Sequence, residues 1–384
     1  MEHNKLIFSK VPTLRFAEYT DEWHKYALSD FVTRITRRNK NNESSLPLTI
    51  SAQYGLVDQI TFFNKTVASV DLSGYYLLYN GDFAYNKSYS NDYAWGAVKR
   101  LDKYEKGCLS SLYFVFRPTD KVDSDYLTHY FETSKWHKGI SDIAGEGARN
   151  HGLLNMAVDD YFATKHYLPS LSEQKKIACF LNLITKRIEI QNKIISDLKV
   201  LKKELNGFLI SRLIKGKESN CKIEDVIDYE QPTGYIVNSD KYIVDGKTPV
   251  LTANKAFFLG YTNEKEGIYD KSDCIIFDDF TLDFKYVDFP FKVKSSAIKI
   301  LTAKKSIELR YFYEYLLFLN LNTNEHKRHY ISEIATLPLY LPSIDEQRRV
   351  LNVLNAISSK ITIEEKYKTT LQTQKKHFLN AMFI

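Results

Sequence analysis

Two stretches of the chain repeat apolar residues at steps of three and four, a spacing that predicts a buried stripe along a long helix. The first stretch falls in residues 169–217 and the second in residues 342–384. We expect each helix to have roughly 37 residues or more, and at about 1.5 Å per residue each spans about 55 Å. The stripe positions are Ile177, Leu181, Ile184, Ile188, Ile195 and Leu198 in the first stretch, and Val350, Leu354, Ile357, Ile361, Leu371 and Phe378 in the second.

Both helical stretches open with the same motif. Residues 168–177 read LPSLSEQKKI, and residues 341–350 read LPSIDEQRRV. The proline suits a position just before a helix, and we expect Ser172 and Asp345 to accept hydrogen bonds from the free amides of the first turn. The repeat therefore predicts a chain that is built twice.

One position of the stripe is polar in both copies: Gln191 in the first helix and Glu364 in the second. A helix edge that turns toward solvent is one explanation. The alternative is a polar pair that fixes the register and the antiparallel orientation of the two helices.

The remaining segments have mixed patterns that predict two α+β domains. Strands are expected at residues 75–79, 112–116, 274–277 and 297–300, and helices at residues 26–31 and 309–321. The chain then divides into a first domain (1–168), a central helix (169–217), a second domain (218–341) and a C-terminal helix (342–384). Because the second helix starts beside the second domain and runs back, two packed helices must be antiparallel. The expected fold class is α+β, with two globular domains separated by two long antiparallel coiled-coil helices in a quasi-twofold repeat.

The net charge of +6 is concentrated in the helical stretches. Residues 169–217 carry 11 basic and 4 acidic side chains, and residues 343–384 carry 7 and 4. The first domain is balanced at 20 of each, and residues 218–342 carry 15 basic and 19 acidic side chains. A solvated helix face is enough to explain the basic helices. Nucleic-acid binding would need small local patches on the domains, or a partner that contacts much of the phosphate backbone.

Signatures of an enzyme site are weak or missing. No two of the nine prolines are adjacent, Gly145 and Gly147 match only part of a glycine-rich cofactor loop, and no Gly-Lys-Ser/Thr phosphate loop occurs. Asp279, Asp283 and Lys285 lie too close together in the sequence for a nuclease triad, so we interpret them as a charged strand or loop. We expect no catalytic residue and no metal site in this chain.

The four cysteines are far apart and lack metal-ligand spacing, so we expect them to be reduced. No apolar run reaches the roughly 18 residues of a membrane span, and residues 1–10 contain no signal-peptide run. These features predict a cytoplasmic protein that does not bind a membrane.

Polar clusters in both domains offer the side chains that contact DNA. Arg and Lys donate to guanine or to phosphate, and Asn pairs with adenine. For any one cluster, an ordinary exposed loop is the alternative. The candidate DNA-binding residues are Arg34, Arg37, Arg38, Lys40, Lys87, Ser88, Tyr89, Asn91, Tyr93, Arg149, Asn150, His151, Lys255, Thr281, Lys285, Lys292, Lys294, Lys327 and Arg328.

Two further motifs lie in the first domain: VPTLRF at residues 11–16, followed by Trp23, and GDFAYNKS at residues 81–88. With the duplicated Leu-Pro-x-x-x-Glu-Gln helices, they resemble the specificity (S) subunit of type I restriction-modification systems over essentially the whole chain. The second domain lacks the Gly-Asp-Phe pattern and has Asp278-Asp279-Phe280 in a loosely comparable place.

This resemblance implies a non-catalytic subunit in which each domain reads one half-site of double-stranded DNA. The helices would act as a ruler and dock two methyltransferase (modification) subunits, with restriction/translocase subunits as further partners. No cofactor is expected in this chain; S-adenosylmethionine is expected in the methyltransferase, and ATP and Mg²⁺ in the nuclease partner. Partner-binding or spacer roles then fall to Glu173, Gln174, Ile177, Leu181, Ile184, Ile188, Glu346, Gln347, Val350, Leu354, Ile357 and Ile361.

Two different reading domains on an antiparallel rod predict an asymmetric, bipartite site with a fixed gap. At about 3.4 Å per base pair, a rod of about 55 Å limits the reach to roughly 16 base pairs. Two other classes stay open: a self-contained DNA methyltransferase or nuclease with an unrecognised site, and a coiled-coil scaffold that does not touch DNA.

Overall fold

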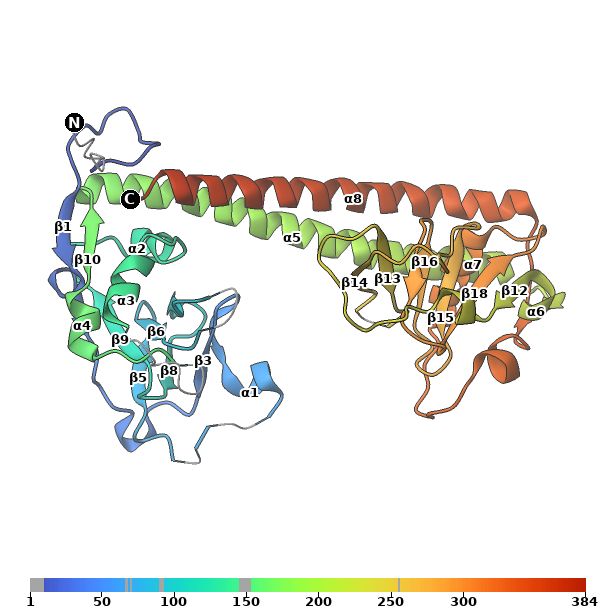
Figure 1. Ribbon diagram of the computed structural model, residues 1–384, viewed down its shortest axis with the longest axis horizontal. Helices are drawn as coiled ribbons and strands as arrows, with labels where there is room; N and C mark the ends of the chain where they lie inside the picture. Colours follow the sequence, from blue (N-terminus) through green and yellow to red (C-terminus); the bar gives the residue numbers. More distant parts are fainter. Residues whose placement is uncertain (1–9, 66–67, 70, 90–92, 145–152, 255) are drawn as a thin grey trace. The chain divides into compact units, whose positions relative to one another are not determined.

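The computed structural model describes residues 10–65, 68–69, 71–89, 93–144, 153–254 and 256–384, and the chain divides into two compact units (Figure 1). Unit 1 comprises residues 1–192 and 367–384, and unit 2 comprises residues 193–366. Each unit therefore contains one globular domain and a part of both long helices. Within the described ranges, no helix has both the length and the apolar character needed to cross a membrane.

A four-stranded antiparallel sheet lies at the centre of unit 1, in the strand order β2-β9-β6-β7. Alternate residues of a strand point to opposite faces, and both faces of this sheet are buried. Phe83 and Tyr85 belong to one apolar cluster, whereas Ala84, between them, belongs to another. The strands are β2 (Val32–Arg34), β9 (Phe114–Pro118), β6 (Phe83–Asn86) and β7 (Ala97–Arg100).

Helices pack on the first face of this sheet, and two strand pairs contribute to the cluster on the second. Tyr85 of the sheet stacks on Tyr161, with ring centroids 4.7 Å apart. The helices are α2 (Ser124–Tyr130), α3 (His137–Ile143) and α4 (Val158–Ala163). The strand pairs are β3 (Leu48–Ser51) with β4 (Gly55–Asp58), which leads into α1 (Gln59–Phe63), and β5 (Tyr76–Tyr79) with β8 (Lys106–Leu109).

Unit 2 has a central antiparallel sheet of the same kind, in the order β12-β18-β15-β16. Ile275 and Phe277 belong to a cluster that includes α7 and parts of both long helices, whereas Ile276 belongs to a separate cluster. The strands are β12 (Ile227–Glu230), β18 (Ile298–Ala303), β15 (Cys274–Asp278) and β16 (Phe284–Val287), and α7 is Leu309–Leu319. A smaller sheet, which supplies residues to that separate cluster, contains β14 (Phe258–Thr262), β13 (Thr248–Leu251) and β17 (Lys292–Val293).

The two units repeat one chain path. In each, a first strand pairs with the strand just before the Leu-Pro-Ser motif: β1 (His24–Ala27) with β10 (Lys165–Leu168), and β11 (Cys221–Lys222) with β19 (Pro338–Leu339). In each four-stranded sheet, the second strand in the order given above is followed along the chain by a helix: α2 follows β9, and α7 follows β18. The predicted internal repeat is therefore confirmed as a structural repeat. The short helix α6 (Ile223–Val226) follows β11 as the 3₁₀ turn η1 (Leu28–Asp30) follows β1, and unit 2 also contains the π-helical turn η5 (Tyr330–Ile334).

The predicted long helices are α5 (Leu171–Ile214) and α8 (Ile344–Ala381), of 44 and 38 residues. In unit 1, the Phe180 and Phe378 rings are 5.0 Å apart and Arg187 lies 5.3 Å from the Tyr367 ring. In unit 2, an ion pair of 2.6 Å joins Lys199 to Glu365. Another of 3.5 Å joins Lys217 to Glu346. Within each unit, residues later in α5 contact residues earlier in α8, so the two helices are antiparallel. The predicted α+β class and the antiparallel helix pairing are confirmed.

The expected helix caps are wrong by two residues. Each helix begins one residue earlier than Ser172 or Asp345, so the preceding serine is the cap. Ser170 accepts a hydrogen bond from the Glu173 amide at 3.4 Å. Ser343 accepts one of 3.4 Å from the Glu346 amide, and the Glu346 carboxylate accepts one of 3.0 Å from the Ser343 amide. The second helix thus has a reciprocal capping box.

The polar stripe position in α5 does not turn toward solvent. Gln191 is only 4% exposed, so that explanation is wrong for the first helix. Glu364 is partly buried and forms an ion pair with Lys360. The pairing of Gln191 with Glu364 stays a hypothesis.

Most shorter elements were predicted at the correct place. Strands β5, β9, β15 and β18 and helix α7 match their expected ranges within about three residues. The helix expected at residues 26–31 is wrong. Strand β1 continues to Ala27 because its backbone pairs with β10, and only a short 3₁₀ turn, η1 (Leu28–Asp30), follows.

Candidate nucleic-acid interface

A basic patch lies around the end of β2 in unit 1. We define the arginine patch as Arg34, Arg37, Arg38 and Arg117. Three of its members lie within a run of five residues, 34–38, whereas Arg117 lies on β9, where the antiparallel register places it opposite Thr33. Arg117 is missing from the sequence-based candidates because only strand pairing brings it next to the others.

A single buried carboxylate orients two of these arginines. Asp82 is fully buried and accepts hydrogen bonds from Arg37 Nη2 at 3.0 Å and from Arg117 Nε at 2.6 Å. The Tyr79 amide also donates to this carboxylate at 2.8 Å. The aspartate of the GDFAYNKS motif therefore holds two cationic side chains in fixed positions.

Ring contacts restrain the patch further. The guanidinium of Arg37 lies 4.2 Å from the Tyr79 ring centroid, and that of Arg38 lies 4.6 Å from the ring of Tyr76. Arg38 also donates to the Gly74 carbonyl at 2.5 Å. Stacked guanidinium groups lose little further conformational freedom when they bind a planar or anionic partner.

The other unit 1 candidates are scattered. Lys40 and Ser88 are exposed, and Tyr93 is exposed beside a cleft that includes Gln53 and Lys376. The Lys87 ammonium lies 4.8 Å from the Phe114 ring, and burial lowers the pKa of this lysine. Tyr89 packs against the main core. Asn91, Arg149, Asn150 and His151 lie outside the described residues.

In unit 2, three polar clusters that are distant in sequence meet around Asp279. This side chain is buried and accepts hydrogen bonds from the backbone amides of His329 at 3.0 Å and Tyr330 at 2.7 Å. Its carboxylate also lies 3.4 Å from Lys299 Nζ and 3.5 Å from Arg328 Nη1. The loops that carry Thr281, Lys294 to Ser296, and Lys327 with Arg328 are thereby brought together.

Arg328 is the most exposed cation held by Asp279. Its side chain is 50% exposed, lies 5.4 Å from the Phe280 ring and donates to the Ser296 carbonyl at 3.4 Å. Lys327 instead forms ion pairs of 2.6 Å with Glu325 and 2.7 Å with Glu333, and these contacts raise its pKa. Arg328 is therefore freer to contact a ligand than its neighbour.

The prediction for Lys292 needs correction. Its side chain is buried, and its ammonium lies 3.1 Å from the Glu264 carboxylate and 2.7 Å from the Glu266 carbonyl. Because Lys292 is buried against the loop that contains Glu264 and Glu266, it is not a surface cation. Thr281 and Lys294 are exposed, Lys285 is partly exposed on β16, and Lys255 lies outside the described residues.

The proposed counterpart of the Gly-Asp-Phe motif in unit 2 is also wrong. Asp82 directly precedes the central strand β6, whereas Asp279 directly follows the central strand β15. The residue in the equivalent position is Asp273, which is exposed and accepts a hydrogen bond of 2.6 Å from the Tyr286 hydroxyl. The buried aspartate thus lies before the start of the central strand in unit 1 and after the end of the corresponding strand in unit 2.

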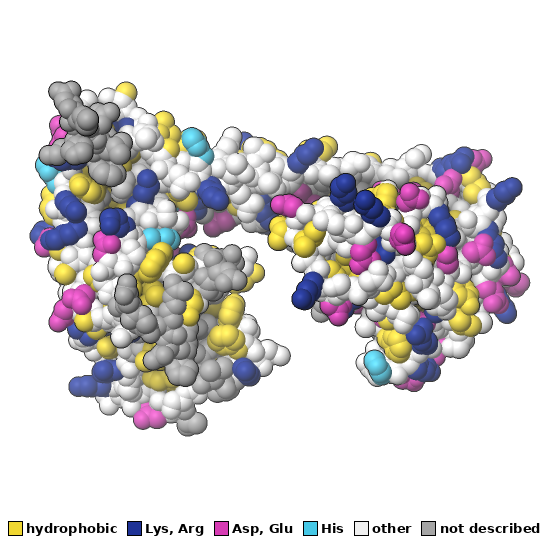
Figure 2. All heavy atoms as spheres, in the orientation of Figure 1, with side chains coloured by type: hydrophobic (Ala, Val, Ile, Leu, Met, Phe, Trp, Pro, Cys, Tyr) yellow, Lys and Arg dark blue, Asp and Glu magenta, His cyan; other side chains and the backbone are white. Residues whose placement is uncertain are grey.

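Asp279 does not sit in a carboxylate cluster. Its contacts are cationic side chains and backbone amides, as above. The part of the chain that the structure describes contains no group of three or more His, Cys, Asp or Glu residues able to hold a metal ion. Figure 2 shows acidic and basic side chains interspersed over the displayed face of unit 2, whose globular part, residues 218–342, carries 15 basic and 19 acidic side chains.

The two glutamines of the duplicated motif, Gln174 and Gln347, are buried inside their own units. Gln174 Oε1 accepts a hydrogen bond from the Asp123 amide at 2.8 Å, and its Nε2 donates to the Pro169 carbonyl at 3.0 Å. The Gln174 side chain is buried, and Asp123 is the N-cap residue of α2. These two hydrogen bonds therefore form a glutamine joint that connects the start of α5 to the start of α2 inside unit 1. Both glutamine side chains face the interior of their own unit, and their partner-binding or spacer role stays a prediction.

The two glutamates of the motif have different roles. Glu173 is buried and forms a bidentate ion pair with Arg15 of the VPTLRF motif, at 2.7 and 2.8 Å. Glu346 is 31% exposed. Its carboxylate accepts a hydrogen bond from the Ser343 amide and lies 3.5 Å from Lys217. Glu173 thus anchors the N-terminal segment and cannot also bind a partner.

Several stripe residues face the core of their own unit. Ile177 and Leu181 are buried in unit 1, and Val350 and Leu354 in unit 2, so a partner cannot reach them. The remaining candidates are Ile184, Ile188, Ile357 and Ile361, of which Ile361 is 9% exposed and the other three are partly buried.

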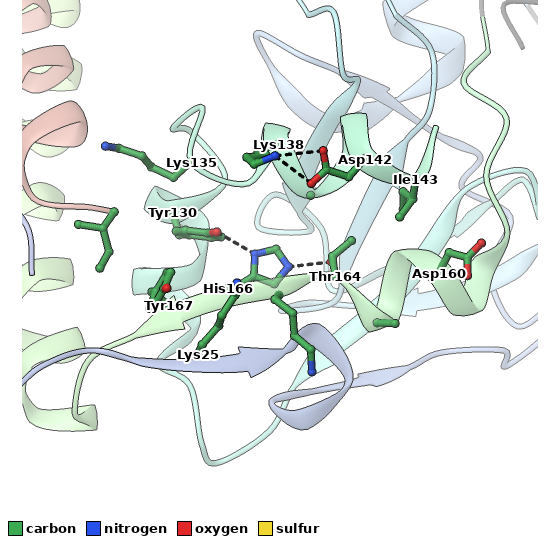
Figure 3. A pocket seen from close by; sticks show the side chains of 14 residues that line it. Lys25, Tyr130, Lys135, Lys138, Asp142, Ile143, Asp160, Thr164, His166 and Tyr167 are labelled. Carbon is green, nitrogen blue, oxygen red and sulfur yellow. Dashed lines mark hydrogen bonds and ion pairs between the residues drawn. The ribbon is translucent and has the colours of Figure 1, made fainter. Parts of the chain in front are cut away.

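A cleft beside β10 contains a buried histidine (Figure 3). Thr164 Oγ1 donates to the Tyr161 carbonyl at 2.7 Å, so it must accept from His166 Nε2, which lies 2.8 Å away. His166 Nδ1 then accepts from the Tyr130 hydroxyl at 2.7 Å. Burial lowers the pKa of His166 to about 4. Because each ring nitrogen has an internal partner, we interpret this histidine as structural.

The fold defines a duplicated α+β chain with two long helices, and comparisons with known proteins agree with this fold. The family model described as "Type I restriction modification DNA specificity domain" matches residues 216–373. A specificity subunit of the Escherichia coli type I restriction enzyme EcoR124I/EcoR124II is 37% identical over 186 residues. That match spans 44% of this chain and 44% of the relative.

Solved structures share the fold over nearly the full length. The S subunit of a type I restriction-modification system from M. genitalium has a TM-score of 0.55 and 15% identity, covering 97% of this chain and 99% of that one. A chain from a study of type I R-M complex assembly and conformational transition also has a TM-score of 0.55 and 15% identity, with coverage of 93% and 96%. These comparisons show that the chain is similar to type I restriction-modification specificity subunits, in sequence over part of its length and in fold over nearly all of it.

Proposed function

We propose that this chain is the DNA-recognition subunit of a type I restriction-modification complex. Each unit reads one half of a bipartite, asymmetric site in double-stranded DNA. The chain itself is non-catalytic: S-adenosylmethionine is bound by its methyltransferase partners, and ATP and Mg²⁺ by restriction/translocase partners.

The observation that carries this proposal is a duplicated scaffold with different surfaces. Both units have the same sheet order and the same glutamine joint. The exposed cations differ, since unit 1 presents the arginine patch and unit 2 presents Arg328 and Lys294. One scaffold with two different reading surfaces suits two different half-sites in a single DNA site.

The helices are proposed to set the gap between the half-sites and to dock two methyltransferase subunits. Docking is supported by large apolar side chains that are exposed at heptad spacing on α5. These are Leu183 and Ile190 in unit 1, and Leu201 and Phe208 in unit 2. They replace the buried stripe residues as the expected contacts of a partner helix.

The test is methylation mapping. The chain is co-expressed with the methyltransferase of its own system, and methylated positions in genomic DNA are mapped by single-molecule sequencing. We expect a bipartite motif with a constant gap, of which only one half changes when residues 1–168 are exchanged for those of another specificity subunit. A continuous motif, or loss of both halves, would contradict the proposal.

The enzyme and scaffold alternatives have their own tests. The purified chain is incubated with DNA, S-adenosylmethionine, Mg²⁺ and ATP, and methylation or cleavage by the chain alone would favour a self-contained enzyme. A complex with the methyltransferase that shows no salt-sensitive mobility shift with DNA would favour the scaffold.

A further inference from the structure

We propose that Asp82, Arg37 and Arg117 form a phosphate clamp that grips the DNA backbone and does not read bases. This inference rests on the proposed DNA-recognition function and assigns a specific role to one surface of unit 1. Asp82 is the positioning residue, and the two arginines are the contacts.

The first step is the charge of the cluster. Two guanidinium groups share one carboxylate, so the cluster has one positive charge more than its internal partner neutralises. A phosphodiester group carries one negative charge. A bound backbone phosphate would therefore complete the charge balance and release a condensed counterion from the DNA.

The second step is the supply of donors. Arg37 uses Nε for the Leu77 carbonyl at 3.2 Å and Nη2 for Asp82. Arg117 uses Nε for Asp82 and Nη2 for the Asn80 carbonyl at 3.3 Å. Each guanidinium has five N–H donors, and neither Nη1 forms a hydrogen bond within the described residues, so its two donors are available there. Donors from two guanidinium groups on one carboxylate suit an anion with several acceptor oxygens.

The third step separates phosphate contact from base reading. The side chains of Arg37 and Arg117 are 35% and 44% exposed. Asp82 and, for Arg37, the Tyr79 ring hold them against the sheet. Base reading requires a side chain that extends into a major groove about 8.5 Å deep. Side chains tied at their guanidinium groups cannot extend that far, but they can meet a phosphate at the surface of the duplex.

Other charges near the cluster do not cancel it. Glu43 is a further carboxylate that interacts with Arg37, and it already accepts a hydrogen bond of 2.6 Å from the Tyr79 hydroxyl and lies 3.6 Å from Lys106. Arg38, which follows Arg37 in the sequence, adds a further positive charge, and its guanidinium lies 4.6 Å from the Tyr76 ring. The surroundings of the clamp are therefore basic on balance.

The experiment compares Arg117→Gln and Arg37→Gln with the wild-type chain in complex with its methyltransferase. Affinity is measured over a series of salt concentrations for two duplexes, one with the mapped motif and one without it. Each variant should weaken both duplexes by a similar factor and reduce the slope of log Kobs against log salt concentration by about 1. The methylated motif should not change.

Matched variants sharpen this result. Lys138→Gln removes an exposed cation that pairs with Asp142 elsewhere in unit 1, and it should leave the slope unchanged. Arg117→Lys keeps the charge and should retain most of the slope. Asp82→Asn keeps both arginines but releases them, and should weaken binding to both duplexes alike. If this buried substitution prevents folding, the two exposed arginine variants carry the test.

The outcomes distinguish this inference from the wider proposal. Unchanged affinity and slope in both arginine variants would overturn the clamp and leave an internal ion network only. A changed base preference would also overturn it, as would an equal effect of Lys138→Gln. A wild-type complex without a bipartite motif would instead overturn the recognition function itself.

Discussion

The side-chain oxygen of Gln347 accepts a hydrogen bond of 2.8 Å from the backbone amide of Glu308. Its amide nitrogen donates to the carbonyls of Pro342 at 2.9 Å and Ser306 at 3.2 Å. Glu308 is the N-cap residue of α7, just as Asp123, the partner of Gln174, is the N-cap of α2. One buried amide thus joins the start of each long helix to the N-cap of a domain helix, α2 for α5 and α7 for α8.

We expect Gln347→Ala to lower the free energy of unfolding by about 2 to 3 kcal/mol, because it leaves a buried amide and two carbonyls without their partner. Hydrogen exchange at the Glu308 amide should become faster. Gln372→Ala is the control, since Gln372 is exposed on the same helix and its loss should change stability by about 0.5 kcal/mol or less. Equal stability of the two variants would show that the joint does not stabilise the domain.

The buried His166 should make stability depend on pH. Its pKa falls from 6.5 to about 4 on folding, so the unfolded chain binds more protons between these values and stability is lost as the pH falls through this window. The loss attributable to this group is at most about 3 kcal/mol. Chemical unfolding from pH 7 to pH 4 measures it.

His166→Asn should reduce this pH dependence between pH 6.5 and 4, because asparagine does not titrate there. His377→Gln removes an exposed histidine and should leave the dependence intact. An unchanged pH profile for His166→Asn would mean that other groups control acid stability.

Lys292 and Lys294 are two residues apart but should behave differently. Lys292→Gln should cost about 2 kcal/mol of stability, because it removes the buried cation beside Glu264. It should leave the salt dependence of DNA binding unchanged. Lys294→Gln alters an exposed side chain, so it should leave stability unchanged and reduce the salt slope if this loop contacts phosphate. Thermal unfolding and salt-dependent binding distinguish the two.

Arg328 is the residue in unit 2 that we expect to read a base. It is half exposed, and its contacts of 3.4 and 3.5 Å lie at the limit of hydrogen bonding. Arg328→Ala should relax the preference at one base pair of one half-site, with a loss of about 1 to 3 kcal/mol in discrimination. Methylation mapping should show the other half-site unchanged.

Lys327→Ala is the matched control for this residue, because its ammonium is held by Glu325 and Glu333. It should leave the motif intact. A motif altered by Lys327→Ala and not by Arg328→Ala would reverse the assignment.

Much of the scaffold was predictable because its determinants are local in sequence. The stripes from Ile177 and Val350 and the duplicated motif identify the helices, and buried runs such as residues 274–277 identify central strands. The candidate site was less predictable because its geometry depends on strand register. Arg117 joins Arg37 only through the pairing of β2 with β9, and Lys292 is buried only because Glu264 lies beside it. The burial of Gln174 could not be predicted, because a sequence does not reveal which polar side chains form hydrogen bonds with buried backbone groups.

Shortening the two long helices tests directly whether they set the gap between the half-sites. Deleting one heptad from each helix keeps the apolar stripe in phase, since the stripe repeats every seven residues. Each deletion shortens a helix by about 10 Å, which corresponds to about three base pairs. The mapped motif should keep both half-sites and lose about three base pairs from its gap. Deleting four residues from each helix is the control, because it moves apolar positions out of phase and should lower stability. A seven-residue deletion that leaves complex formation and the gap unchanged would contradict a spacing role for α5 and α8.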